Sequence, residues 1–176
     1  MKGLALAAMV VVAIPAAAQD VPLGFGIQGG IFAPTDRTLK DIFGDGWFNW
    51  GITPGVIKTT NTGIKIDYDF ALTTKSRNGN KVAILRPTVG ATVAFGVGNI
   101  VPYGAARTGL AYVDYAMDRP GGRLSGKRVV PSTNIEFGIV FGGRFGLSAR
   151  YDWVQAIDGI GYSGFSIQAT YQIAKF

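Results

Sequence analysis

The stretch Ile64–Thr73 reads IKIDYDFALT, and apolar residues alternate with charged or small ones along its whole length. Side chains on a β-strand point alternately to its two faces. Such a strand carries isoleucine, tyrosine, phenylalanine and leucine on one face, and lysine and two aspartates on the other. This distribution suits a strand between lipid and a polar interior, so the stretch predicts a membrane-crossing strand.

The same period of two recurs in eight segments that are separated by turn residues. The predicted strands are 23–33, 47–57, 62–74, 82–95, 100–115, 133–141, 145–154 and 165–175. Four longer connections alternate with three tight turns, 35–46, 75–81, 117–132 and 156–164 against 58–61, 96–99 and 142–144. Bacterial single-chain barrels combine an even strand number with long external loops and short periplasmic turns. The sequence therefore predicts an all-β fold, an eight-stranded antiparallel up-and-down transmembrane β-barrel.

The first 18 residues have the layout of a secretory signal peptide. Lys2 is followed by the apolar run 4–14, then by Pro15 and by the small residues 16–18. The apolar run is shorter than the roughly 20 residues that a membrane-spanning helix needs. We therefore expect residues 1–18 to be a signal peptide and residues 19–176 to form one barrel domain in the cell outer membrane.

The residue types that most enzymes and metal sites need are missing. The chain has no cysteine and no histidine, which excludes disulfides, thiolate or imidazole metal sites and Ser-His-Asp triads. Gly24-x-Gly26-x-x-Gly29 matches a dinucleotide-binding fingerprint, but the match lies within a predicted strand and no helix follows. Residues 121–127 resemble a phosphate-binding loop, but Arg128 stands where a serine or threonine would hold magnesium. We predict no enzyme, no cofactor, no metal and no nucleic-acid partner.

A soluble periplasmic ligand-binding barrel would show the same alternation with its two faces reversed. The distribution of aromatic residues favours a barrel in the membrane. They gather near strand ends in two groups, as in the belts at membrane interfaces. The predicted outer belt contains Trp47, Phe48, Trp50, Tyr112, Tyr115, Tyr151, Trp153 and Tyr162. The predicted periplasmic belt contains Phe95, Tyr103, Phe141 and Phe145.

With these features the chain resembles the small outer-membrane β-barrel family of diderm bacteria, a porin-family barrel domain that includes outer-membrane protein A and its X and W relatives. The likeness is carried by the signal peptide, the glycine-rich strand 24–30, the Val101-Pro102-Tyr103-Gly104 segment and the terminal Phe176. It covers the whole mature chain and implies the fold and recognition by the barrel-insertion machinery. The implied C-terminal insertion signal is Tyr171, Ile173 and Phe176. Family members usually continue the alternation to the last aromatic residue, whereas Phe176 is out of phase with Tyr171; either a bulge corrects this or recognition is atypical.

Charges in the middle of predicted strands should point into the barrel, because a charged residue against lipid at mid-depth costs about 2–4 kcal/mol. The predicted interior residues are Lys65, Asp67, Asp69, Arg86, Arg107, Glu136, Arg150 and Asp152. The interior of an eight-stranded barrel is only wide enough for its own side chains, so we expect a salt-bridged network. A polar conduit or gate is the alternative. Pro54 and Pro87 each remove a ladder donor, which predicts local bulges or, alternatively, a lateral opening.

The predicted external loops are basic. The residues concerned are Lys75, Arg77, Lys81, Arg119, Arg123, Lys127 and Arg128. Such patches attract anionic lipid, including lipopolysaccharide, or an acidic surface on another cell, and plain solvated loops are the alternative. The segment 35–43 predicts a short amphipathic helix that is capped by Thr35 or Asp36 and that lies on the membrane rim or covers the barrel mouth.

We therefore expect a monomeric outer-membrane barrel with a structural or surface-interaction role. The main alternative is a narrow channel or lateral-exit transporter for small, including hydrophobic, solutes.

Overall fold

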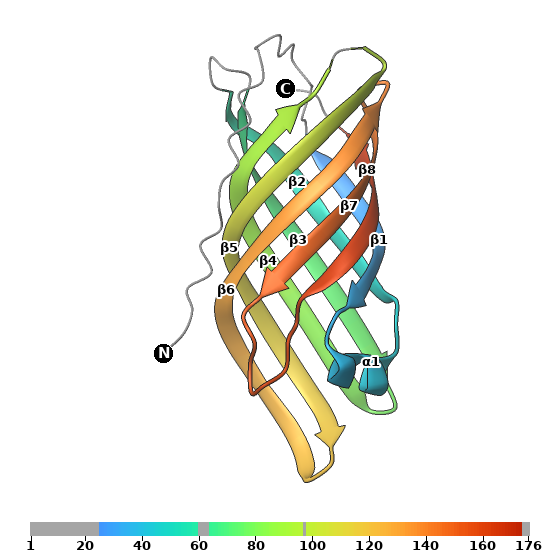
Figure 1. Cartoon of the computed structure of the whole chain (residues 1–176), viewed down its shortest axis with the longest axis vertical. Coiled ribbons are helices and arrows are strands. Elements are labelled where there is room, and N and C mark those ends of the chain that lie inside the picture. The colour runs from blue at the N-terminus through green and yellow to red at the C-terminus, as the bar shows by residue number, and fades with distance from the viewer. Residues whose placement is uncertain (1–24, 60–63, 97, 174–176) are drawn as a thin grey trace.

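The computed structural model describes residues 25–59, 64–96 and 98–173, without the side chains of 54–59. The predicted signal peptide and Phe176 lie outside these residues. Eight antiparallel strands close into a barrel in chain order, and the first strand pairs with the last (Figure 1). The strands are β1 (Gly26–Pro34), β2 (Trp47–Thr59), β3 (Lys65–Arg77), β4 (Asn80–Ala94), β5 (Ile100–Arg119), β6 (Gly122–Phe141), β7 (Phe145–Val154) and β8 (Gly164–Gln172). The predicted eight-stranded up-and-down barrel is confirmed.

One short helix, α1 (Arg37–Phe43), lies between β1 and β2. It sits at one end of the barrel, which we call the α1 end (Figure 1). The opposite end, where β2, β4 and β6 finish, is called the turn end. No helix in the described part of the chain is long and apolar enough to cross a membrane.

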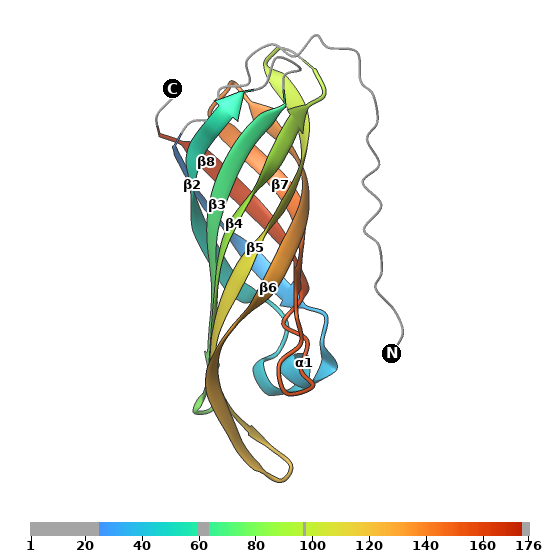
Figure 2. The same ribbon diagram turned by 90° about the vertical axis from the view of Figure 1, so that its left-hand side faces the viewer.

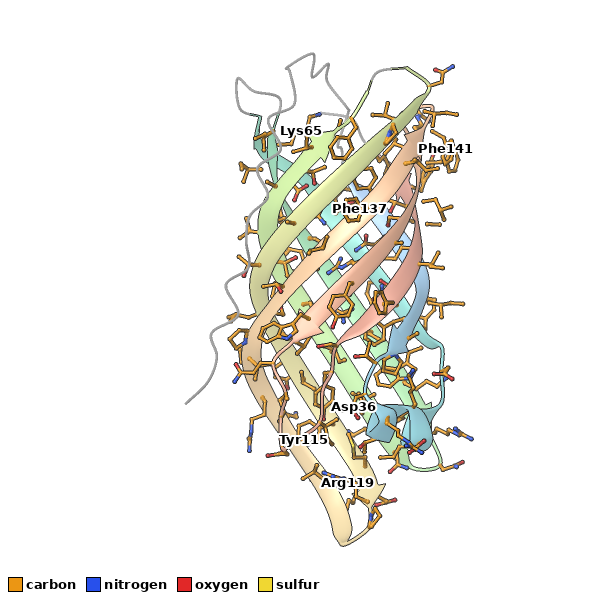
Figure 3. All side chains as sticks on the ribbon, in the orientation of Figure 1. Asp36, Lys65, Tyr115, Arg119, Phe137 and Phe141 are labelled. Carbon is orange, nitrogen blue, oxygen red and sulfur yellow. The ribbon has the colours of Figure 1, made fainter. Side chains whose placement is uncertain are left out.

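The outer wall of the barrel is apolar, and its inner face is polar in the middle of the strands. Phe137 and Ile167 are 63% and 66% exposed on the outer wall, whereas the mid-strand charged residues are buried inside. Figure 3 shows Phe137 and Phe141 pointing away from the barrel. A soluble ligand-binding barrel needs the reverse orientation, so this arrangement speaks against the soluble alternative.

Four aromatic residues that were expected in the belts point inward instead. These are Trp47, Tyr103, Tyr115 and Tyr162, and all four are buried. Trp47 lies in the opposite strand phase to Phe48 and Trp50, which do face outward. The remaining outer-belt residues Tyr112 and Trp153 are exposed on the wall, as are Phe95, Phe141 and Phe145 of the other belt, while Tyr151 is half-buried.

The predicted loops 75–81 and 117–132 are wrong, because strands extend through most of these residues. β5 and β6 each extend over 20 residues and pair without interruption to Arg119↔Gly122. The predicted loop 75–81 is a tight turn at Asn78 and Gly79, whose φ angles of 50° and 78° suit a two-residue hairpin connection. Figure 2 shows that the β5–β6 hairpin projects well beyond α1.

The two prolines behave differently. Register shifts lie between Ile52 and Gly55 and between Val56 and Lys58, so the bulge predicted at Pro54 is confirmed. The register of β4 with β3 is the same before and after Pro87, and so is its register with β5. The bulge predicted at Pro87 is therefore wrong. The β4–β5 ladder passes from Leu85↔Tyr112 to Thr88↔Gly109 and leaves Arg86 and Pro87 without partners on β5. A local loss of pairing without a shift is thus enough to accommodate Pro87.

Candidate functional site

The α1 end of the barrel is filled by a cluster of buried apolar side chains, which we call the apolar plug. Its members are Phe32, Leu39, Phe43, Trp47, Val82, Ile84, Ala111, Val113, Tyr115, Met117, Val154, Ile157, Ile160 and Tyr162. They come from five strands, from α1 and from the β7–β8 loop. The plug was not predicted from the sequence, although Ile84 and Val113 are apolar residues in the inward phase of their strands.

α1 covers the barrel mouth instead of lying on the rim. Leu39 and Phe43 on one face of the helix are buried in the plug. Asp36 is the N-cap: its Oδ1 accepts from the backbone N of Thr38 at 2.8 Å and of Leu39 at 3.3 Å. Its Oδ2 accepts from the backbone N of Gly161 at 2.8 Å, which ties the helix to the β7–β8 loop. The expected cap is thus Asp36, and the expected covering of the mouth is observed.

On the turn-end side of the plug lies a first group of ion pairs, which we call the central cluster. Arg150 on β7 donates from Nη1 to Asp69 Oδ2 at 2.5 Å and from Nε to Asp152 Oδ1 at 2.8 Å. Gln28 Nε2 donates to Asp69 Oδ1 at 2.7 Å. β3 and β7 are four strands apart in a closed ring of eight, so the Arg150–Asp69 pair crosses the full width of the lumen.

Arg86 forms the boundary between the plug and the central cluster. Its guanidinium lies 5.2 Å from the ring centroid of Phe32, a plug residue. On its other side Nε lies 3.7 Å from Asp152 Oδ1, and Nη2 donates to Thr73 Oγ1 at 2.6 Å and Asn49 Oδ1 at 3.2 Å. A cation over an aromatic face is favourable where water is excluded, which suits this position.

A second group of ion pairs, the turn-end cluster, is centred on Arg107. Its Nε lies 2.7 Å from Asp67 Oδ1 and its Nη1 lies 2.8 Å from Glu136 Oε2. Tyr103 donates from Oη to Glu136 Oε1 at 2.6 Å. Gly138 makes this possible, because a Cβ at that position would lie 2.7 Å from the Tyr103 ring.

The structure places all eight predicted interior residues inside the barrel. Each is at most 8% exposed, and seven of them form the two clusters. Lys65, the eighth, is buried near the turn end, at the opposite end of the barrel from Asp36 (Figure 3). The uncharged partners of these charges were not predicted from the sequence, although they lie in the inward phase of their strands. They are Gln28, Asn49, Thr73, Thr92 and Tyr103.

A cavity of about 50 Å³ adjoins the turn-end cluster. Its polar lining includes Gln28, Asp67, Tyr103, Arg107, Thr170 and Gln172. No plug residue lines it, so it does not reach the α1 end. Among the described residues there is no group of acidic side chains that could hold a metal ion.

The predicted basic residues lie mostly on the extended hairpins and not in loops. Arg123 pairs with Asp118 at 3.0 Å and Lys127 with Asp114 at 3.8 Å. Lys75 donates to the backbone O of Gly46 at 3.0 Å. Within the described residues no ion pair forms at Arg77, Lys81, Arg119 or Arg128.

Two residues of the implied insertion signal face outward at the turn end. Tyr171 and Ile173 are exposed, and the Tyr171 ring lies 5.0 Å from that of Phe145 on β7. This side of the wall is apolar, as an interfacial belt requires. Phe176, the third residue of the implied signal, lies outside the described part of the chain.

Comparison with known proteins supports the fold and nothing finer. No family model matches the chain, and no curated protein matches it. Among solved structures, Neisserial surface protein A is 12% identical with a TM-score of 0.59, over 85% of this chain and 97% of that one. The outer membrane enzyme PagL is 14% identical with a TM-score of 0.60, over 84% and 99% of the two chains. The N-terminal β-barrel domain of Pseudomonas aeruginosa OprF is 10% identical with a TM-score of 0.54, over 84% and 96%. At such identities the likeness is one of architecture: this chain has the eight-stranded barrel fold of bacterial outer-membrane proteins.

Proposed function

We propose that this chain is an integral outer-membrane β-barrel with a sealed lumen and a structural or surface-interaction role. The apolar outer wall and its two aromatic belts support a position in lipid. The shared architecture with outer-membrane barrels supports the same location. Export by the signal peptide and delivery to the barrel-insertion machinery belong to this proposal.

The observation that carries the proposal is the Arg150–Asp69 ion pair on the turn-end side of the apolar plug. The pair crosses the lumen, and both side chains are at most 1% exposed. An eight-stranded barrel has room for little beyond its own side chains. A solute would have to displace both the plug and this buried ion pair, so a static pore is not favoured.

The basic hairpins provide the surface for external contacts. Lys81 and Lys127 precede the wall residues Leu85 and Val129 along their strands, on the same outward face and nearer the hairpin tips. Cations just beyond an apolar wall lie at the height of lipid headgroups, where they attract phosphate groups. Contact with anionic outer-leaflet lipid such as lipopolysaccharide is therefore part of the proposed role. The absence of histidine and cysteine supports a non-enzymatic role.

The test is the conductance of the refolded mature chain in a planar bilayer, after folding has been checked by heat-dependent gel mobility. We expect an inserted but electrically silent barrel, with a general porin in the same bilayer as the positive control. Discrete and reproducible openings would overturn the sealed-lumen proposal.

A narrow transporter is the second candidate, and the cavity beside the turn-end cluster favours it. If solutes cross, Arg107 and Glu136 would line their path, and Arg107→Ala would change ion selectivity or the rate of liposome swelling with small sugars. A silent barrel with no swelling in either form would leave the cavity as a closed vestibule.

A further inference from the structure

β6 has one free edge, which begins where its pairing with β7 stops. It pairs with β5 along its whole length but with β7 only between Ser132 and Phe141. In the described part of the chain no strand pairs with residues 122–131 on the side away from β5. Figure 2 shows the tip of this hairpin projecting past α1. A row of unpaired N–H and C=O groups is a template for an additional strand.

Alternate residues of β6 direct their backbone groups to this edge. The backbone N of Gln155 donates to the O of Pro131 at 3.1 Å, so Pro131 points away from β5. Backbone groups of successive residues in a strand point alternately to its two neighbours. The residues that share the direction of Pro131 within the free edge are Arg123, Ser125, Lys127 and Val129. The O of Lys127 accepts from the side chain of Arg128 (Nη1) at 3.2 Å, so an added strand would displace that contact.

The hairpin packs against the plug, which orders its free edge. An isolated two-stranded hairpin is only marginally stable in water. Here Tyr115 and Met117 of β5 are buried in the apolar plug, and Leu124 and Val130 of β6 pack against it. Tyr115 also donates to Asp158 Oδ2 at 2.6 Å, which ties the hairpin to the β7–β8 loop. A template that is already ordered loses less entropy when a partner binds.

The charge of the edge selects the chemistry of its partner. Arg123, Lys127 and Arg128 lie within residues 122–131, all three are exposed, and the segment contains no acidic residue. The carboxylates that face Arg123 and Lys127 lie on β5, the strand on the occupied side, and Arg123 Nη2 also donates to the O of Gly79 at 3.2 Å. Carboxylates of an added strand would compete with these contacts for the two exposed cations. Lysines at an edge discourage pairing with a second basic edge, so an acidic strand is the complementary occupant.

We propose that the free edge of β6 binds an extended acidic segment of a partner protein outside the cell, which adds a strand to the hairpin. This rests on the proposed function, because the hairpin must face the exterior. In the added strand, carboxylates would lie beside Arg123 and Lys127 on one face, and apolar side chains beside Leu124 and Val130 on the other.

The experiment uses the refolded mature chain in nanodiscs and a labelled peptide of about ten alternating Glu and Val residues, the length of a long strand. Binding is followed by fluorescence anisotropy, and amide hydrogen exchange is measured along β6. We expect the peptide to slow exchange at Ser125 and Lys127 at least about tenfold, and a peptide with Lys in place of Glu not to bind.

The variant Ser125→Pro separates the edge from the rest of the hairpin. The Ser125 N–H points to the free edge, so proline there removes an edge donor without removing a bond to β5. We expect Ser125→Pro to weaken peptide binding at least about tenfold and Ser125→Ala, which keeps the N–H, to leave it unchanged. Binding that Ser125→Pro does not weaken, or protection away from residues 122–131, would overturn the proposal.

The remaining outcomes distinguish the edge proposal from self-association and from the sealed-lumen proposal. Protection of Ser125 that grows with protein concentration and needs no peptide would replace the acidic partner by a second copy of this chain. A correctly folded, silent barrel that binds no acidic peptide would refute the edge proposal alone. A conducting barrel that still binds the peptide at the edge would refute the sealed lumen alone.

Discussion

Arg150 on β7 and Asp69 on β3 form an ion pair across the whole lumen, with 2.5 Å between Nη1 and Oδ2. The two strands stand opposite each other in the ring of eight. Arg150 also holds Asp152 at 2.8 Å, so one guanidinium neutralises two buried carboxylates. The central cluster is therefore an integral part of the core, and the stability of the barrel depends on the completeness of this cluster.

Replacement of Arg150 by methionine should destabilise the barrel strongly. Arg150→Met keeps most of the volume but leaves Asp69 without its cation and Asp152 with only the longer contact to Arg86. Removal of one partner of a buried pair typically costs about 3–5 kcal/mol, because the other charge stays desolvated. Urea unfolding of the detergent-refolded chain, followed by tryptophan fluorescence, measures the change in free energy.

The matched control is Arg37→Met on α1. Arg37 pairs with Asp41, but their side chains are 95% and 72% exposed, and surface pairs contribute little. We expect no measurable shift of the unfolding midpoint for this variant. Equal midpoints for Arg150→Met and the wild-type chain would show that the central cluster is not structural.

Loss of the helix cap should loosen α1 without unfolding the barrel. Asp36→Ala removes the acceptor of Thr38 and Leu39 and the bond from Gly161. Loss of an N-cap side chain typically costs about 0.5–2 kcal/mol. Amide exchange in α1 and trypsin cleavage after Arg37 and Lys40 should both become faster, while heat-dependent gel mobility stays unchanged.

Asp36→Asn resolves the two roles of the side chain. Asparagine keeps a capping oxygen but offers an amino group where Gly161 needs an acceptor. We expect α1 exchange close to that of the wild type and faster exchange only at Gly161. Loosening of α1 equal to that of Asp36→Ala would mean that the loop contact, and not the cap, orders the helix.

The alternation of residue types was sufficient to predict the strand number and the orientation of the charges. Strands such as Ile64–Thr73 have one apolar and one polar face, so both strand and phase can be read from the sequence. The inward phase of residues 100–115 could not be read, because the inward face of β5 carries Val101, Ala111 and Val113 as well as Arg107. The end of a strand cannot be read in this way once it leaves the lipid. β5 and β6 continue beyond Tyr112 and Val129 as strands with mixed faces, and Pro120 and Gly121 between them read as part of a loop.

The plug shows a second limit. Trp47 and Tyr115 lie near strand ends, where aromatic residues occur both at membrane interfaces and in a capped mouth. Their strand phase separates the two cases, because Trp47 alternates with the outward Phe48. The contribution of Ile157 and Ile160 could not be predicted, since a loop has no periodicity and its contacts depend on tertiary packing.

The hydrogen bond from Tyr115 to Asp158 joins β5 to the β7–β8 loop, and it makes the stability of this contact depend on pH. This hydrogen bond, with burial as the second cause, raises the pKa of Tyr115 above its ordinary value. An unfolded tyrosine titrates near pH 10. Because the folded-state pKa is higher, the contribution of the bond is complete below about pH 10 and is lost as the pH rises through the raised value.

The comparison of wild type with Tyr115→Phe isolates this effect. At neutral pH we expect the variant to be less stable by about 1 kcal/mol, the usual contribution of one hydrogen bond. The difference should shrink above about pH 10, because the wild-type bond is lost when Tyr115 ionises. Tyr112→Phe on the outer wall is the control, and a difference that stays constant up to high pH would contradict the assignment of the bond to Tyr115.

An arginine on the outer wall tests whether lipid surrounds the barrel. Ile135 is 53% exposed on β6, midway between Val129 near the α1 end and Phe141 at the turn end. At the bilayer midplane Ile135→Arg should cost about 2–4 kcal/mol, whereas Val129→Arg near the interface should cost about 0–1 kcal/mol. Reversible folding into lipid vesicles measures both. If water surrounded the barrel, both substitutions would place a charge on an exposed strand at similar and small cost, so the difference between the two positions reports the membrane directly.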